Sequence, residues 1–104
     1  MRRGEVWLAQ VGGKLRPVVV VTRDEVLDVR VNVTVAEITT TARGLVVEVP
    51  VDPDCGIEQA SVINCDGLHT VSQRRLTRRL GSVDGETVEG ICAGVTATLG
   101  CDHR

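Results

Sequence analysis

Aromatic side chains are almost absent from this sequence of 104 residues, which contains one tryptophan, Trp7, and no tyrosine or phenylalanine. A domain that binds proline-rich peptides needs a groove lined by aromatic rings, and a platform that stacks nucleotide bases needs such rings on its surface. The composition argues against both kinds of binding module. The core must be built from aliphatic side chains, chiefly valine.

Long apolar runs are also missing. No segment approaches the roughly 20 apolar residues of a membrane-spanning helix. The first residues lead into Glu5 rather than into the apolar stretch of a secretory signal. We therefore expect a cytoplasmic protein that does not associate with a membrane. Hydrophobic residues make up 42% of the chain and charged residues 25%, which is typical of a soluble globular protein, and residues 1–104 are interpreted as one domain.

The sequence lacks the spacings that mark a metal or cofactor site. None of the four cysteines forms the Cys-x-x-Cys pair of a zinc or redox site, so structural roles are expected for Cys55, Cys65, Cys92 and Cys101. A phosphate-binding Walker loop, a dinucleotide fingerprint and a nucleophile elbow are absent as well. We expect neither a bound metal nor a cofactor.

The overall charge is not typical of a nucleic-acid-binding protein, because the formal net charge is −2. The charges are unevenly placed, however, and four arginines fall within residues 74–79. Such a cluster is more typical of a solvated face than of a binding site. A local basic groove on a mildly acidic protein remains compatible with this distribution.

The chain reads as strands first and one helix last. β-branched and apolar residues predict strands at 4–11, 16–22, 29–39, 44–49, 61–65 and 68–71. A turn is expected at Gly12-Gly13 and a helical turn at 23–27. Asp66-Gly67 predicts a hairpin turn between the last two strands, and Pro50 is expected to break the fourth.

From Asp84 onward the apolar residues follow a helical period. The residues expected on the buried face are Val88, Ile91, Cys92, Val95 and Leu99. Asp84 or Ser82 can cap the start of the helix and Gly100 can end it. The expected fold is mainly β with a C-terminal helix: a strongly bent antiparallel sheet or small barrel that the helix closes.

Several side chains are candidates for chemistry. Arg16 stands at the start of a valine-rich strand, and its planar guanidinium suits phosphate oxygens, although a surface ion pair explains it equally well. The run Thr39 to Thr41 ends the strand at 29–39, where hydroxyls can donate to a phosphate or satisfy a turn. His69 and His103 are candidates for an acid–base pair, but nothing in the pattern brings them together.

Taken together, the segments resemble the MazF/PemK family of toxin endoribonucleases. Five pieces match in order: Arg3–Trp7, Arg16–Val21, Val35–Thr41, Ala60–Ile63, and Leu80–Val83 leading into the helix that ends at Leu99-Gly100. The resemblance covers nearly the whole chain. It implies the small SH3-like barrel of the CcdB/MazF/Kid toxins, a homodimer, a cognate MazE-like antitoxin, and metal-independent cleavage of single-stranded RNA.

The resemblance also implies roles for particular residues. Arg16 and Thr39 match the catalytic pair of the family, with the 2'-hydroxyl of the RNA as the attacking group. Contacts to RNA are expected from Lys14, Thr40, Thr41, Asp66 and His69. The loop before Arg16 is shorter here than in many relatives and has no acidic residue, so Lys14 is expected to supply part of its contacts.

Two other functions are compatible with such a fold. A CcdB-like gyrase poison acts through a hydrophobic C-terminus, whereas this chain ends in the polar segment 100–104. The Arg16 and Thr39 pair also favours the nuclease over such a poison. The near absence of aromatic residues argues against an inert SH3-like interaction module. Both alternatives are less compatible with the sequence than the nuclease.

Overall fold

The computed structural model describes residues 1–45 and 47–101. Six antiparallel strands form one sheet in the order β4-β5-β3-β2-β1-β6. The strands are β1 (Glu5–Val11), β2 (Lys14–Val20), β3 (Asn32–Thr39), β4 (Glu48–Val51), β5 (Ser61–Ser72) and β6 (Leu76–Ser82). The helical elements are α1 (Asp24–Leu27), η1 (Pro53–Cys55), η2 (Gln73–Arg75) and α2 (Gly85–Leu99).

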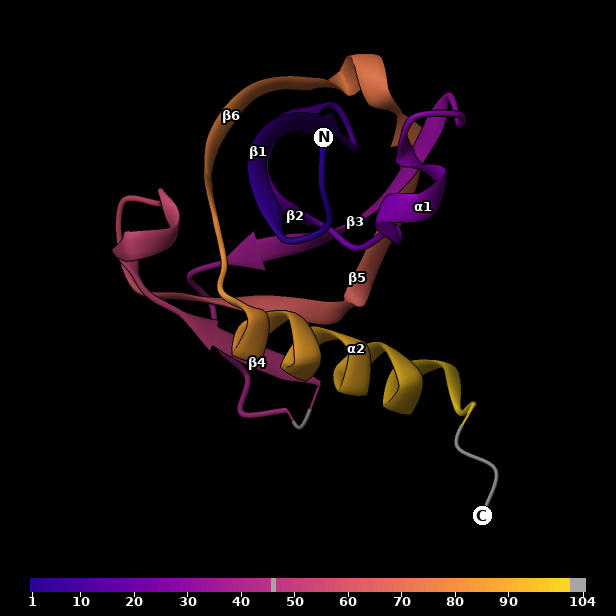
Figure 1. Ribbon diagram of the computed structural model, residues 1–104. Helices are drawn as coiled ribbons and strands as arrows, with labels where there is room; N and C mark the ends of the chain where they lie inside the picture. The colour runs from indigo at the N-terminus through magenta and orange to yellow at the C-terminus, as the bar shows by residue number, and fades with distance from the viewer. Residues whose placement is uncertain (46, 102–104) are drawn as a thin grey trace.

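The sheet curls so that β6 wraps around β1, and α2 lies beside β4 and β5 (Figure 1). The predicted mainly β fold with a C-terminal helix is confirmed.

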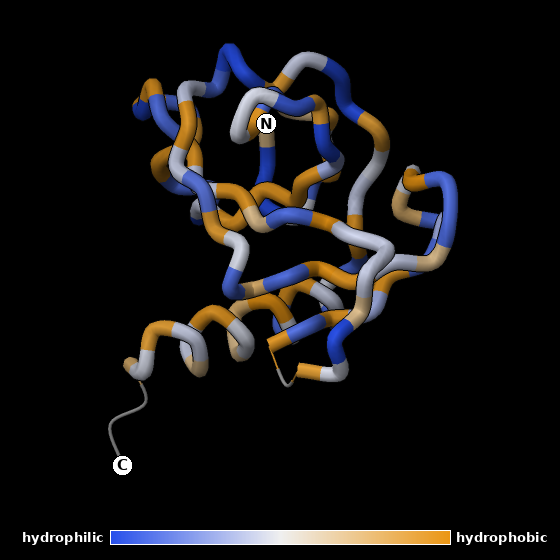
Figure 2. The backbone as a smooth tube through the Cα atoms, turned by 180° about the vertical axis from the view of Figure 1, so that it is seen from behind, coloured by the Kyte–Doolittle hydropathy of each residue, from blue (hydrophilic) through white to orange (hydrophobic). Residues whose placement is uncertain are grey.

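The strand β3 divides the hydrophobic interior in two. Val33 and Val35 belong to a core inside the curled part of the sheet, with Val18 and Val20 of β2. Further along β3, Ala36 and Ile38 point to the opposite face, and each belongs to a second core that also contains Ile91 of α2. Hydrophobic stretches of the backbone accordingly occur both in the curled part of the sheet and in the part beside α2 (Figure 2). Because successive strand residues point to opposite faces, Glu37 and Thr39 share the face of Val35 but extend beyond its core.

The helix α2 begins and ends as the sequence predicts. The Asp84 carboxylate accepts a hydrogen bond from the Thr87 N–H at 2.8 Å, and Gly100 ends the helix with a left-handed φ of 68°. Of the predicted buried face, Ile91 is buried and Leu99 is not, since Leu99 is 60% exposed at the last turn. The helix has passed beyond the sheet there, so the expectation for Leu99 was wrong.

The predicted hairpin turn at Asp66-Gly67 was also wrong. Both residues lie inside β5, which runs without interruption along β3. The pairing register shifts here, because Ala36 pairs with Leu68 whereas Glu37 pairs with Asn64. Extra residues on one strand form a β-bulge, which bends the strand and re-aims neighbouring side chains. An Asp-Gly pair serves such a bulge as well as it serves a turn.

Two edge strands also differ from the sequence-based prediction. β4 begins at Glu48 and includes Pro50, paired with Val62; an edge strand tolerates a proline because one of its sides has no ladder to complete. Val46, in the predicted strand at 44–49, lies outside the described residues. The strand β6 was not predicted, since its arginines obscure the strand pattern.

The backbone of the segment that follows β4 packs directly against the backbone of β6. A Cβ atom built on Gly81 would lie 2.2 Å from the Cys55 carbonyl oxygen, and one built on Gly56 would lie 2.2 Å from the Leu80 carbonyl oxygen. Gly56 also has a φ of 104°, which favours glycine. These two glycines let the segment 52–60 lie directly on β6.

Gly81→Ala is therefore expected to lower the free energy of unfolding by about 1–3 kcal/mol, the usual cost of overpacking. Gly85→Ala is the matched control, because a Cβ there meets nothing within 4 Å. Chemical denaturation of both variants measures the difference. Equal midpoints for Gly81→Ala and the wild type would contradict the close packing.

None of the helices in the described residues is long and apolar enough to span a membrane. All four cysteines are free thiols. Burial raises the pKa of Cys55 and of Cys65, so both thiols are protonated and unreactive at neutral pH. This is compatible with structural roles for these two cysteines.

Candidate active site

A pocket of about 700 Å³ opens at the ends of β2 and β3, between β6 and the segment 56–61. Its walls carry both charges and hydroxyls. The residues that line it are Leu8, Lys14, Leu15, Arg16, Pro17, Glu37, Ile38, Thr39, Thr40, Gly56, Ile57, Glu58, Gln59, Ser61, Arg78 and Leu80. The two residues expected to be catalytic, Arg16 and Thr39, therefore share one cavity.

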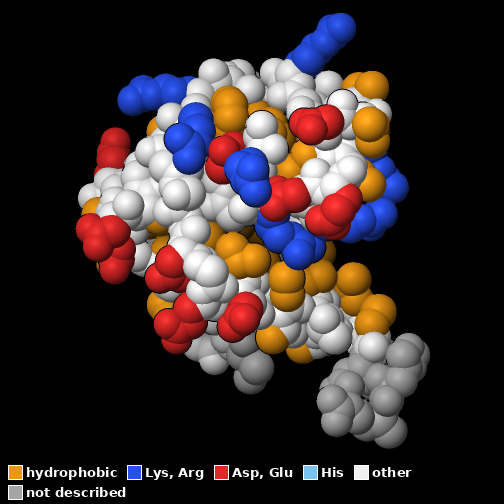
Figure 3. Space-filling model, in the orientation of Figure 1, with side chains coloured by type: hydrophobic (Ala, Val, Ile, Leu, Met, Phe, Trp, Pro, Cys, Tyr) orange, Lys and Arg blue, Asp and Glu red, His pale blue; other side chains and the backbone are white. Residues whose placement is uncertain are grey.

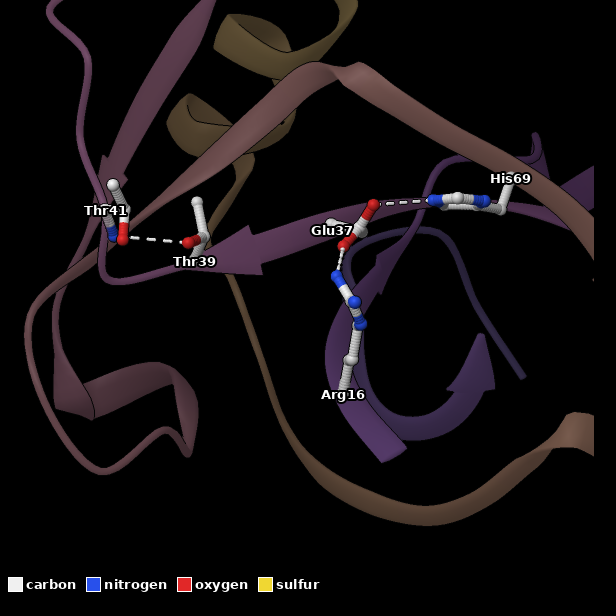
Figure 4. Close-up of polar contacts among 5 residues, drawn as sticks. All are labelled: Arg16, Glu37, Thr39, Thr41 and His69. Atoms are coloured by element: carbon white, nitrogen blue, oxygen red, sulfur yellow. Dashed lines mark hydrogen bonds and ion pairs between the residues drawn. The ribbon is translucent and has the colours of Figure 1, made fainter. Parts of the chain in front are cut away.

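Arg16 is held by a carboxylate that sequence analysis did not single out. Its Nη1 donates a hydrogen bond to Oε1 of Glu37, and the two side chains form an ion pair. The other carboxylate oxygen, Oε2, lies 2.6 Å from Nε2 of His69. Figure 4 shows Glu37 on β3 between Arg16 on β2 and His69 on β5. Three strands thus contribute one residue each to a continuous polar network.

Strand register explains why these three side chains meet. Glu37 pairs with Val18, and Val35 pairs with His69. Residues two apart on a strand share a face, so Arg16 and His69 lie on the same side of the sheet as Glu37. A Cβ atom built on Gly67 would lie 3.4 Å from Oε2 of Glu37, an ordinary contact distance, so the β5 bulge passes directly beside the carboxylate.

Two opposing effects set the ionisation of Glu37. Partial burial raises the pKa of this carboxyl, but the hydrogen bonds from His69 and Arg16 and their charges together outweigh it, so the pKa lies below its ordinary value. Glu37 is therefore ionised at neutral pH. A carboxyl whose pKa is depressed by folding stabilises the fold above its ordinary pKa, and this contribution is lost as the pH falls through the lowered value.

Arg16 retains donors that Glu37 does not use. Its Nε is buried and has no hydrogen-bond partner among the described residues, while 40% of the side chain is exposed. A buried donor without a partner carries a desolvation cost. An anion that enters the pocket and accepts from Arg16 would relieve that cost, and the planar fork of arginine suits phosphate oxygens.

Thr39 is the last residue of β3, and its hydroxyl oxygen already accepts one hydrogen bond. Its Oγ1 accepts a hydrogen bond from the Thr41 N–H at 3.1 Å (Figure 4). An oxygen that accepts this bond keeps its own hydrogen for donation to another group. The backbone of the following loop thus orients the Thr39 hydroxyl on the wall of the pocket.

The remaining predicted contacts separate into two groups. Lys14 and Thr40 line the pocket with Arg16. Thr41 and Asp66 are exposed and do not line it. His69 is not part of the lining either, and its side chain makes a polar contact with Glu37. His103 lies outside the described residues.

The pocket also contains charges that the sequence did not assign to it. Arg78 of β6 adds a cation and Glu58 an anion. On the face seen in Figure 3, basic side chains lie among acidic ones, in keeping with the net charge of −2. The positive charge that could bind a polyanion in this pocket therefore comes from Lys14, Arg16 and Arg78.

Comparisons with known proteins agree with this fold and identify the family. Residues 2–99 match the model of the PemK-like, MazF-like toxins of type II toxin–antitoxin systems. The chain is 50% identical over 68 residues to endoribonuclease MazF3 of Mycobacterium tuberculosis, a segment that spans 65% of this chain and 66% of that protein. It is 38% identical to the probable endoribonuclease MazF2 of the same organism, over 97% of this chain and all of that one.

Solved structures show the same architecture. The Mycobacterium tuberculosis toxin MazF-mt6 superposes with a TM-score of 0.89 and 37% identity, covering 95% of this chain and 99% of that one. An endoribonuclease from a mycobacterial species, solved with its cognate antitoxin, superposes with a TM-score of 0.90 over 100% of this chain and 99% of that one, at 23% identity. The second likeness concerns the fold alone.

Proposed function

Because the chain belongs to the PemK-like, MazF-like family of toxins of type II toxin–antitoxin systems, we propose that its endoribonuclease activity resides in the pocket of Arg16 and Thr39, where it cuts single-stranded RNA. The observation that carries the proposal is the buried, unpartnered Nε of Arg16 beside a pocket that Thr39 also lines. The donors of both side chains are in place before any substrate arrives.

In the proposed reaction the 2'-hydroxyl of the RNA attacks the adjacent phosphorus and the bond to the 5'-oxygen breaks. The 2'-hydroxyl loses a proton and the leaving 5'-oxygen gains one, so the products are a 2',3'-cyclic phosphate and a 5'-hydroxyl. Charge builds up on the phosphorane oxygens. Arg16 would neutralise that charge and Thr39 would donate a hydrogen bond to it, as fixed donors stabilise other transition states of this kind.

The proposed reaction needs no metal ion. The described residues include no cluster of three or more His, Cys, Asp or Glu side chains that could hold a metal. The attacking and leaving groups both belong to the RNA, and the guanidinium supplies the positive charge that a metal would otherwise bring.

Cleavage of a long unstructured RNA is therefore expected to proceed at the same rate with and without EDTA. Mapping the cut ends should give 5'-hydroxyls and cyclic phosphates. Loss of activity in EDTA that a divalent ion restores would argue for a metal-dependent mechanism. The Arg16→Ala protein, purified in the same way, controls for contaminating ribonucleases.

We also propose that the protein acts in the cytoplasm as a homodimer whose subunits share the RNA groove, and that a MazE-like antitoxin inhibits it. A chain of this length has little area for a core, so dimerisation would add stability. An acidic antitoxin segment can offer carboxylates to Lys14, Arg16 and Arg78. RNA and antitoxin would then compete for these cations.

A further inference from the structure

We propose that Glu37 is a positioning residue, which fixes the guanidinium of Arg16 for phosphate binding and transmits the charge of His69 to the pocket. The proposal rests on the proposed function of Arg16. Three observations support it: the two-sided contact of the carboxylate, its position beside the β5 bulge, and the place of His69 outside the pocket lining.

The two oxygens of Glu37 have separate partners. Oε1 accepts from Nη1 of Arg16, and Oε2 contacts Nε2 of His69 at 2.6 Å. A guanidinium held through one terminal nitrogen has little freedom left, while its Nε and its other terminal nitrogen stay free of Glu37. When the side chain is ordered before RNA arrives, the entropic cost of ordering it is not paid in the binding step. Small displacements of a reacting group can cost large factors in rate.

His69 acts on this site through Glu37. Its side chain is 35% exposed and that of Glu37 is 21% exposed, so solvent screens the pair only in part. With a neutral His69 the three side chains together are neutral, because Arg16 and Glu37 cancel. With a protonated His69 they carry one positive charge. In that protonation state the network attracts RNA phosphate more strongly.

Glu37 and Arg16 line the pocket together with three other charged residues, Lys14, Glu58 and Arg78. From β2, Arg16 is charged and Val18 is apolar; from β5, His69 is titratable, whereas Asn64 and Gly67 are uncharged. The charges found to shift the pKa of Glu37 are those of Arg16 and His69. The network is therefore a simple three-membered relay.

Glu37→Gln separates the effect of position from the effect of charge. The amide keeps the shape but removes the ion pair, so we expect the single-turnover rate at saturating RNA to fall by about tenfold or more, while KM stays the same or decreases. Glu58→Gln is the matched control, since it removes an equal charge from the same pocket and should lower the rate far less. Equal rate losses in the two variants would overturn the positioning role.

The relay is tested by nuclear magnetic resonance without reference to cleavage. The side-chain Nε–H signal of Arg16 should shift when histidine gains or loses its proton in a pH titration. The experiment uses a His103→Gln background, which leaves His69 as the one remaining histidine. The shift should vanish in His69→Gln and in Glu37→Gln. An unchanged pH dependence in either variant would overturn the relay.

The two experiments distinguish failure of this proposal from failure of the proposed function. A wild-type protein that cuts no RNA would refute the function, yet the Arg16 signal would still report whether Glu37 links it to His69. A wild-type rate and pH profile in Glu37→Gln would refute the positioning role and leave the nuclease intact.

Discussion

Arg16→Ala is expected to abolish RNA cleavage, with a loss of at least about 10³ in single-turnover rate, the lower end of what a transition-state arginine contributes in phosphoryl transfer. The guanidinium supplies the positive charge in the proposed mechanism, and alanine leaves the pocket with the unpaired negative charge of Glu37. Reversed polarity at this point should repel the phosphate as well as fail to stabilise the phosphorane. The measurement is cleavage of a short labelled RNA with excess enzyme.

The fold should survive this substitution. Arg16 is 40% exposed at the pocket wall, and a partly exposed ion pair contributes at most about 1 kcal/mol. Arg16→Ala should therefore keep the circular dichroism spectrum and nearly the same unfolding midpoint. Full activity in the folded variant would refute the assignment of the site.

Arg78→Ala is the matched control for charge. Arg78 is another arginine in the lining of the same pocket, on β6, whereas the ion pair with Glu37 belongs to Arg16. Loss of Arg78 should weaken RNA binding and reduce the salt dependence of that binding, while the rate at saturating RNA changes little. An equal collapse of that rate in both variants would mean that the pocket needs only net positive charge.

The sequence predicted the elements whose patterns are local. The alternation of β3, the glycine turn before β2, and the caps of α2 each depend on a few neighbouring residues, and all three appear in the structure. The bulge in β5 depends instead on a partner strand more than 20 residues away. An Asp-Gly dipeptide specifies no more than a local change of direction, so the sequence alone does not distinguish a turn from a bulge.

The site was only half visible in the sequence for a related reason. Arg16 and Thr39 stand out through their resemblance to family motifs. Glu37 lies inside one of those motifs but reads as the polar residue of an alternating strand. Its role emerges from pairing with Val18 on one side and from the bulge at Gly67 on the other. A signal was available in the sequence: a charged residue two positions after a buried valine needs a partner.

Thr39→Ala is expected to lower the single-turnover rate by about 10² or more, by analogy with the loss of one donor from an oxyanion hole. The hydroxyl of Thr39 accepts from the Thr41 N–H at 3.1 Å, so its own hydrogen is directed elsewhere and is available to a phosphorane oxygen. Alanine removes that donor and leaves the loop amide without its acceptor. Because the residue lies at a strand end, the effect on stability should be small beside the effect on rate.

Two further variants separate the donor from its surroundings. Thr39→Ser keeps the hydroxyl and should restore most of the rate. Thr41→Ala keeps the backbone N–H that orients Thr39 and changes only an exposed side chain, so it should leave the rate near that of the wild type. If serine fails to restore activity while the fold is intact, the methyl group and not the hydroxyl is what the site requires. Thr39 would then shape the pocket, and Arg16 alone would stabilise the phosphorane.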